Sequence, residues 1–210
     1  MERLHFANKR SVENESQIQQ DLIFKNLEIV CEITGLDYIW DMSITKAIEN
    51  IEASSVDQIA SHLNQLVADS YGLLGQLHLA HWNVEGTDFL PLHQMFQDQY
   101  EELFVAIDDI AERVRALGKY AEGGLKKLAT ISKVNEGPSA SAASAKDFVS
   151  SVLLAHEVVI EQAVAGRKVA AEAGDAESED LLIGRVRIHQ KAVWFLNSYL
   201  KYFRSLFLVP

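Results

Sequence analysis

Two histidines and two carboxylates lie in one stretch of the chain, HWNVEGTDFLPLHQMFQDQYEELFVAIDDIAER, and together could bind a metal ion. The imidazoles are those of His81 and His93, and the carboxylates are those of Asp108 and Glu112. Imidazole nitrogens and carboxylate oxygens are donors that suit Fe(II). The chemistry that this stretch predicts is therefore the binding and oxidation of ferrous iron.

One amphipathic helix is predicted to carry three of these four side chains. Asp88 is placed to cap it, Pro91 lies in its first turn, and Gly118 follows its last turn. Its apolar residues recur at helical spacing: Phe89, Leu92, Phe96, Leu103, Ile107, Ile110, Val114 and Leu117. Asp108 and Glu112 are four residues apart, so they share one face of this helix.

A single chain cannot close a metal site from these residues. His93 and Asp108 are separated by about 22 Å along a helix that rises about 1.5 Å per residue. His81 ends the preceding helix, and a short turn brings it close to His93. An isologous two-fold contact would join the histidines of one chain to the carboxylates of another, giving two sites per dimer. Taken singly, each of these residues is more often a solvated or capping side chain than a ligand.

The same stretch resembles the Dps family of miniferritins. The matching residues are His81-Trp82-Asn83-Val84, Gly86, Phe89, Leu92-His93, Phe96, Tyr100, Asp108 and Ala111-Glu112-Arg113. The likeness covers about residues 55–205 and includes a late segment, DLLIGRVRIHQKAVWFLNSYL, that looks like the last helix of that family.

The resemblance implies a fold, an assembly and an activity. Members of the family are ferritin-like four-helix bundles that form hollow cytoplasmic shells of twelve subunits, and some of them also coat DNA. They oxidise Fe(II), preferably with hydrogen peroxide, and store the ferric iron inside the shell, which protects the cell from oxidative damage. For this chain, the resemblance implies an intersubunit ferroxidase centre made of His81 and His93 from one subunit with Asp108 and Glu112 from its neighbour.

One position departs from the family pattern. Members usually carry Asp or Glu four residues after the second histidine, whereas this chain has Gln97, followed by Asp98. A glutamine carbonyl can bind iron but brings no charge, and Asp98 is rotated by about 100° around the helix. We therefore expect weaker binding at one of the two iron positions. The alternative function is a structural, DNA-compacting or partner-binding cage with a weakened ferroxidase centre.

The whole chain predicts an all-α, ferritin-like bundle. Its 210 residues are 48% apolar and include three prolines, so it can bury one good core of helices. Long helices are expected at about residues 55–82, 89–117, 145–173 and 177–203, with a short one at about 126–131. Ser55 and Gln58 predict a capping box at the start of the first helix.

The connection between the second and third long helices is the long crossover that is typical of ferritin-like folds. It spans residues 118–143. Residues 55–210 contain no Glu-x-x-His motif, which a ferritin needs on two helices for a di-iron site inside one bundle. The absence of that motif favours the intersubunit site.

Residues 1–54 exceed what the bundle of residues 55–210 needs, and they predict an extra N-terminal helical segment. Ser11 can cap a helix that reaches Thr34, and residues 43–51 can form a second helix. We favour packing of this extension on the shell over docking of a protein partner, because large exposed apolar patches are uncommon.

The charge of the chain argues against DNA binding. The net charge is −11, and the five Lys and Arg of residues 1–54 are outnumbered by ten acids, so no lysine-rich tail can neutralise phosphates. An acidic shell would instead attract Fe(II). The single cysteine, Cys31, fits a reducing cytosol. Neither a signal peptide nor an uncharged apolar run of 18 residues indicates a membrane.

Four further side chains have competing explanations. His78 lies one turn before His81 and is interpreted as a polar interface residue rather than as an aid to metal entry. Trp82 either packs against the site, where the resemblance suggests that it quenches radicals, or belongs to the core. His156 and His189 are interpreted as structural or surface residues rather than as ligands.

Overall fold

Five helices and no strand make up the part of the chain that the structure describes. This computed structural model describes residues 50–206, with side chains as far as Lys201. The two predicted N-terminal helices lie outside these residues, except that Asn50 and Ile51 form a turn and a bend rather than the end of a helix. The all-α fold class is confirmed.

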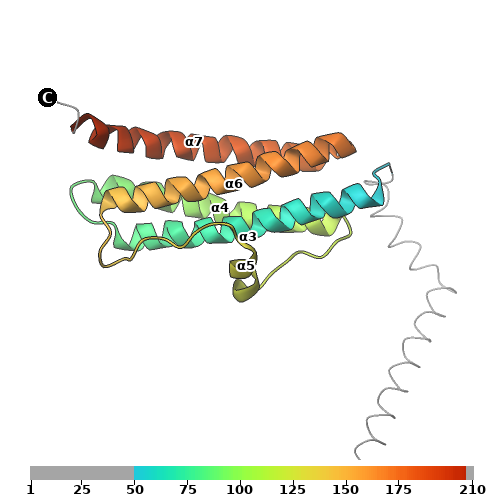
Figure 1. The fold of residues 1–210 in the computed structure, drawn as a ribbon, viewed down its shortest axis with the longest axis horizontal. Helices are drawn as coiled ribbons and strands as arrows, with labels where there is room; N and C mark the ends of the chain where they lie inside the picture. The colour runs from blue at the N-terminus through green and yellow to red at the C-terminus, as the bar shows by residue number, and fades with distance from the viewer. Residues whose placement is uncertain (1–49, 207–210) are drawn as a thin grey trace, which may run out of the picture. The chain divides into compact units, whose positions relative to one another are not determined.

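Four long helices form the bundle: α3 (Ala53–Asn83), α4 (Phe89–Ala116), α6 (Ala145–Ala173) and α7 (Ala176–Leu206). α3 packs on α4 and α6, α6 packs on α7, and α4 meets α7 over only a short length. In Figure 1, α4 and α6 begin at the same end of the bundle, because the crossover between them runs back along it and carries the short helix α5 (Leu125–Ile131). This is the predicted long crossover.

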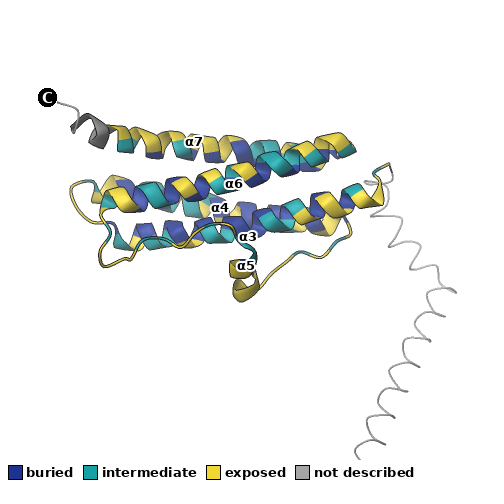
Figure 2. Ribbon diagram, viewed as in Figure 1, coloured by how far each residue is buried: buried dark blue, intermediate teal, exposed yellow. Residues whose placement is uncertain are grey.

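The core lies where the apolar stripes of the four long helices meet (Figure 2). Its largest fully buried side chains include Ile59, Leu63, Leu66 and Leu77 of α3, Phe96, Leu103 and Ile110 of α4, Phe148 of α6, and Leu182 and Leu196 of α7. α6 is long and apolar enough to cross a membrane by composition alone, but 50% of its most apolar window is buried inside the bundle. Its apolar residues are therefore accounted for by packing on α3 and α7.

The first bundle helix begins earlier than the sequence predicts. The backbone N–H of Ser55 donates to the carbonyl of Glu52 at 2.8 Å, which places Ser55 inside the first turn. The predicted capping box of Ser55 and Gln58 is therefore wrong, and Glu52 occupies the N-cap position without a side-chain cap. A capping box does form at the start of α6, where the side chains of Ser144 and Asp147 each accept from the other's backbone N–H.

The crossover is fixed to α3 by a buried carboxylate and a close approach. Asp69 is fully buried and accepts a hydrogen bond of 2.6 Å from the backbone N–H of Lys133. One turn further along α3, a Cβ at Gly72 would lie 2.7 Å from the Ser132 hydroxyl, so only glycine leaves room for the crossover. These contacts hold the crossover and α5 against the outer side of α3.

Candidate metal centre

The short turn between α3 and α4 brings His81 and His93 into direct contact. His81 lies in the last turn of α3, and His93 lies near the start of α4. Their imidazole rings stack with centroids 3.7 Å apart and an interplanar angle of 18°. The predicted histidine half-site is therefore formed within one chain.

Reciprocal hydrogen bonds set the orientation of both rings. Nδ1 of His81 lies 2.9 Å from the carbonyl oxygen of His93, and Nδ1 of His93 lies 2.8 Å from the carbonyl oxygen of His81. A carbonyl oxygen can only accept, so each Nδ1 carries the proton and donates. In the neutral ring, Nε2 then keeps its lone pair, which is the tautomer that binds metals when Nδ1–H is held by a carbonyl.

Aromatic residues surround this histidine pair. The Tyr100 ring meets His81 edge-on at 5.2 Å and His78 edge-on at 4.6 Å. The Trp82 ring stacks on His78 at 5.1 Å and is 70% exposed, so it belongs to the surface beside the site rather than to the core. Burial, and secondarily repulsion from His81, lower the pKa of His78 below its usual value. These causes favour the neutral form of the His78 imidazole.

Asp108 and Glu112 are both exposed on α4 and lie far from the histidines of their own chain. The straight helix between His93 and Asp108 spans about 22 Å. Within residues 50–206, no three His, Cys, Asp or Glu side chains come together to hold a metal ion. The structure thus brings the two histidines together and leaves the two carboxylates as a separate half-site.

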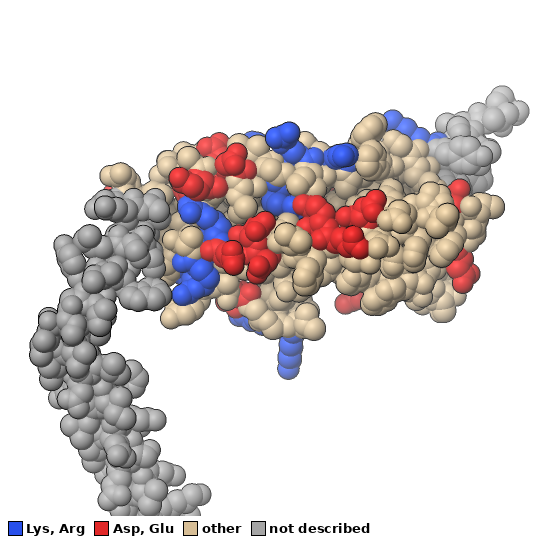
Figure 3. Space-filling view, turned by 180° about the vertical axis from the view of Figure 1, so that it is seen from behind, with Lys and Arg blue, Asp and Glu red and all other residues tan. Residues whose placement is uncertain are grey.

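The face of α4 is strongly acidic around this second half-site. Helix α4 contains Asp98, Glu101, Glu102, Asp108, Asp109 and Glu112 against only Arg113 and Arg115. Figure 3 shows Asp and Glu gathered across the middle of the face seen from behind. Such a field raises the local concentration of cations.

Gln97 forms a hydrogen bond with Glu101, which is not among the ligands that the sequence predicts. Its Nε2 donates to Oε1 of Glu101 at 2.7 Å. Asp98, the other neighbour considered as a ligand, accepts instead from Gln94 at 2.8 Å on a different side of the helix. The spacing of four residues from Gln97 to Glu101 was the signal in the sequence that could have identified this carboxylate.

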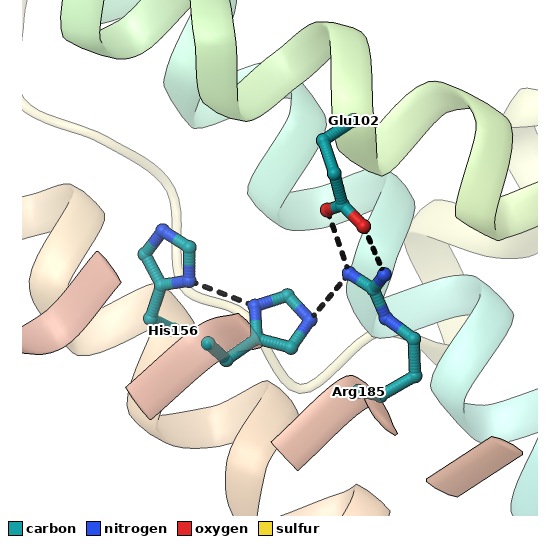
Figure 4. Close-up of polar contacts among 4 residues, drawn as sticks. Glu102, His156 and Arg185 are labelled. Atoms are coloured by element: carbon teal, nitrogen blue, oxygen red, sulfur yellow. Dashed lines mark hydrogen bonds and ion pairs between the residues drawn. The ribbon is translucent and has the colours of Figure 1, made fainter. Parts of the chain in front are cut away.

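A second histidine pair lies inside the bundle. His156 of α6 and His189 of α7 are 3% and 1% exposed, and their Nδ1 atoms are 2.9 Å apart. Arg185 binds His189 Nε2 at 3.0 Å and forms a bidentate ion pair with Glu102 of α4 (Figure 4). His156 Nε2 lies 3.0 Å from Oε1 of Gln99. The interpretation of both histidines as structural residues fits this arrangement, and they are not surface residues.

The proton positions in this second pair follow from its two ends. An arginine can only donate, so His189 Nε2 accepts and His189 Nδ1 carries the proton. That proton points at His156 Nδ1, so His156 carries its own proton on Nε2 and donates it to Gln99. Burial, followed by repulsion from Arg185, lowers the pKa of His156 to about 3. Burial, then the positive charges near it, also holds the pKa of His189 well below 6.5.

Comparison with known proteins decides the family. A family model described as a ferritin-like domain matches residues 60–206. The DNA protection during starvation protein 2 of Bacillus anthracis is 32% identical over 68% of this chain and 97% of its own length. The general stress protein 20U of Bacillus subtilis is 33% identical over 69% of this chain and 98% of its own. The chain belongs to the Dps family.

Solved structures agree with this assignment. A Dps protein from Bacillus brevis superposes with a TM-score of 0.67 at 32% identity, over 71% of this chain and 99% of its own. The antigen TpF1 from Treponema pallidum gives 0.69 at 28% identity, over 71% and 96%. The resemblance noted in the sequence is thus confirmed, and so is the ferritin-like fold. The predicted extension at residues 1–54 falls outside the matched domain, which starts at residue 60.

Proposed function

We propose that this Dps protein oxidises Fe(II) at sites shared by two subunits and stores the ferric product inside a hollow homo-oligomer, a dodecamer as in its family. The observation that carries the proposal is the pair of Nδ1 to carbonyl hydrogen bonds between His81 and His93, which leaves both Nε2 lone pairs for a metal. The two imidazoles supply neutral donors, and the exposed Asp108 and Glu112 of the partner subunit would supply the charge.

A two-fold axis across α4 joins the two half-sites in a consistent register. If two α4 helices cross antiparallel with His93 opposite Glu112 of the partner subunit, then Gln97 falls opposite Asp108 of the partner subunit. Both pairings place the axis near residues 102 and 103. One contact thus completes two identical sites.

Exposed apolar side chains next to His81 and near the proposed axis support such a contact. Phe104, close to the proposed axis, is 66% exposed, and Leu125 of α5 is 77% exposed. Trp82, next to His81, lines a groove of ≈ 460 Å³ between α3 and the crossover together with Leu125. Large apolar residues in such numbers on one surface are typical of a protein interface.

The chemistry requires two irons and one oxidant. With hydrogen peroxide, each Fe(II) gives up one electron, the O–O bond breaks, and two Fe(III) and two hydroxide ions result. Because both electrons arrive together, no hydroxyl radical leaves the site. The acidic surface of α4 would draw Fe(II) toward the site, and carboxylates facing the cavity would bind the ferric product. The names of the relatives, which refer to starvation and general stress, fit such a protective role.

Mixing two inactive variants tests the shared site directly. The first variant carries His81→Ala and His93→Ala, and the second carries Asp108→Asn and Glu112→Gln. Each alone should lose rapid Fe(II) oxidation while still eluting as an assembled oligomer. Co-expressed at equal levels, the two variants should recover about one quarter of the wild-type rate, because half of the dimers are mixed and each mixed dimer has one intact site.

A site within one chain would give no recovery in the mixture, and peroxide consumption that is unchanged in the histidine variant would also refute the proposal. Conversion of Fe(II) is followed by absorbance of the ferric product, and peroxide by its own assay. Wild-type protein that is co-expressed with itself under two tags serves as the control for mixing.

A second candidate function is a cage that compacts DNA, suggested by the name of the Bacillus anthracis relative. The net charge of −11 opposes it, because DNA affinity comes from cations that neutralise phosphates. A gel-shift assay at physiological salt separates the two functions: retarded DNA would support this second candidate. Removal of residues 1–49, followed by a pull-down, tests whether the extension binds a protein partner.

A further inference from the structure

We propose that Glu101 supplies the carboxylate that the metal centre lacks at Gln97, so that each shared site holds two irons with three acidic ligands. This inference rests on the proposed ferroxidase function. It concerns a residue that lies two helical turns beyond His93, outside the set of four ligands from which the function was argued. One observation, the hydrogen bond between Gln97 and Glu101, carries it, and the register of the proposed contact and a charge count support it.

The hydrogen bond places the Glu101 carboxylate at the end of the Gln97 side chain. Oε1 of Glu101 accepts from Nε2 of Gln97 at 2.7 Å. Side chains on a helix lean toward its N-terminus, so Glu101 reaches back along α4 toward Gln97 and His93. The amide nitrogen is occupied by this bond, and Gln97 Oε1 therefore remains as the atom that can bind a metal beside the carboxylate.

The register keeps Glu101 inside the proposed contact. His93, Gln97 and Glu101 follow one another at intervals of four residues, each step turning by only about 40° around the helix. In the antiparallel pairing, Glu101 lies between Gln97 and the two-fold axis, opposite Phe104 of the partner subunit. Its carboxylate then lies at the edge of the shared site, next to Asp108 of the partner subunit.

The charge count explains what Glu101 adds. Two Fe(II) ions bring four positive charges, and Asp108 with Glu112 of the partner subunit brings two negative ones. The family pattern places a third carboxylate where this chain has Gln97, and Glu101 restores that third charge one turn further along. Charge complementarity matters here because the contact removes the site from water, where unbalanced charge is most costly.

Asp98 provides a matched control for Glu101. It is an exposed acid on the same helix, and it accepts from Gln94 at 2.8 Å in the same spacing of four residues. It is rotated by about 100° from Gln97, away from the line of His93, Gln97 and Glu101. A loss of any acid from α4 would weaken cation binding through the general field, and Asp98→Asn measures that background.

The test is a titration of the assembled, metal-free protein with Co(II), followed by calorimetry and by the visible absorption of the bound ion. Wild type should bind two Co(II) per shared site. Glu101→Gln keeps a group that can accept from Gln97 Nε2 and removes only the charge, so it should weaken the second Co(II) roughly 10- to 100-fold. Asp98→Asn should show only the small loss that comes from the general field, well below the loss in Glu101→Gln, and Gln97→Asp added to Glu101→Gln should restore the second ion.

Unchanged binding of the second Co(II) by Glu101→Gln, or equal losses in Glu101→Gln and Asp98→Asn, would overturn the inference while leaving the proposed function intact. If instead wild type and the His81→Ala, His93→Ala variant bound Co(II) equally, the proposed metal centre itself would fail. The two failures are therefore distinguishable in one set of titrations.

Discussion

Two pairs of histidines in this bundle differ in the partners of their ring nitrogens. His81 and His93 stack near the surface, each donating from Nδ1 to a backbone carbonyl, and both Nε2 lone pairs remain for a ligand. His156 and His189 lie in the interior, and all four of their ring nitrogens have partners within the protein. The same side chain thus keeps an available lone pair in one place and is fully hydrogen-bonded within the bundle in the other.

The difference shows that hydrogen-bond partners, rather than proximity, decide what an imidazole pair can do. The inner rings are also in direct contact, with their Nδ1 atoms 2.9 Å apart, but Arg185 donates to His189 and so places one proton between the two rings. A metal there would have to displace that proton beside a buried guanidinium. At the outer pair, backbone carbonyls hold the proton on Nδ1 of each ring, so Nε2 of each ring keeps its lone pair.

The largest expected effect comes from removing one inner histidine. His189→Ala leaves a cavity and deprives His156 Nδ1 and Arg185 of partners, which should lower the free energy of unfolding by about 3–5 kcal/mol. His93→Ala, at the outer pair, should cost about 1 kcal/mol or less, because water can replace its hydrogen bonds. Urea unfolding, followed by circular dichroism at one fixed protein concentration, measures both. Similar losses in the two variants would contradict the distinction between the pairs.

The next effect is a dependence of stability on pH to which the inner pair should contribute the largest part. The pKa of His156 is lowered to about 3 and that of His189 lies well below 6.5, so both stay neutral in the folded chain. In the unfolded chain both take up protons as the pH falls below about 6.5, so stability falls in that direction. From pH 7.5 to 5.5, the two histidines together should remove on the order of 3 kcal/mol of stability.

The control for this pH effect is the double variant His156→Leu, His189→Leu, which lacks both titrating groups but keeps the bidentate pair of Arg185 and Glu102. Its unfolding midpoint should fall much less over the same pH interval. Carboxylates contribute to the slope in both proteins, so the comparison is made on the difference between them. Parallel slopes would mean that the inner histidines are not neutral in the folded state.

The outer pair could be predicted from the sequence, and the inner pair could not. His81 and His93 flank one short turn between helices whose limits are clear, so their contact follows from local structure. His156 and His189 belong to different helices, and the periodicity of each helix places both on its apolar side without saying that they meet. The hydrogen bond between His156 and Gln99 of α4 depends on how three helices pack. The residue pattern of a single helix does not predict that packing.

Helix boundaries likewise include some that the sequence predicts and one that it does not. The predicted helix at about residues 145–173 agrees with α6, where the structure shows Ser144 and Asp147 capping the start and Gly174 ending the helix at a φ of 75°. The Ser55 and Gln58 pattern has the same form but caps nothing, because the backbone continues into a helix from Ala53. The family pattern points to position 97, which Gln97 occupies, and to its neighbour Asp98, so it does not single out Glu101 one turn further along.

The smallest expected effect concerns the hydrogen bond between His156 and Gln99, which ends the series of hydrogen bonds that runs from Arg185 through His189. Gln99→Leu removes the acceptor of the His156 Nε2 proton, which costs about 1–2 kcal/mol, and also removes the buried Nε2 of Gln99, which has no partner among the described residues. The two changes largely offset each other, so the free energy of unfolding should move by less than about 1 kcal/mol. Arg185 still donates to His189, so His156 cannot turn its proton elsewhere.

Gln99→Glu separates this explanation from a simple packing effect. The carboxylate has almost the shape of the amide, but its charge favours the protonated form of His156 and should raise the pKa of that imidazole. Stability should then decline less steeply between pH 7.5 and 5.5 than in wild type, whereas Gln99→Leu should keep the wild-type slope. If both variants gave the wild-type slope, His156 would not be donating to residue 99, and the proton order inferred from Arg185 through His189 would be wrong.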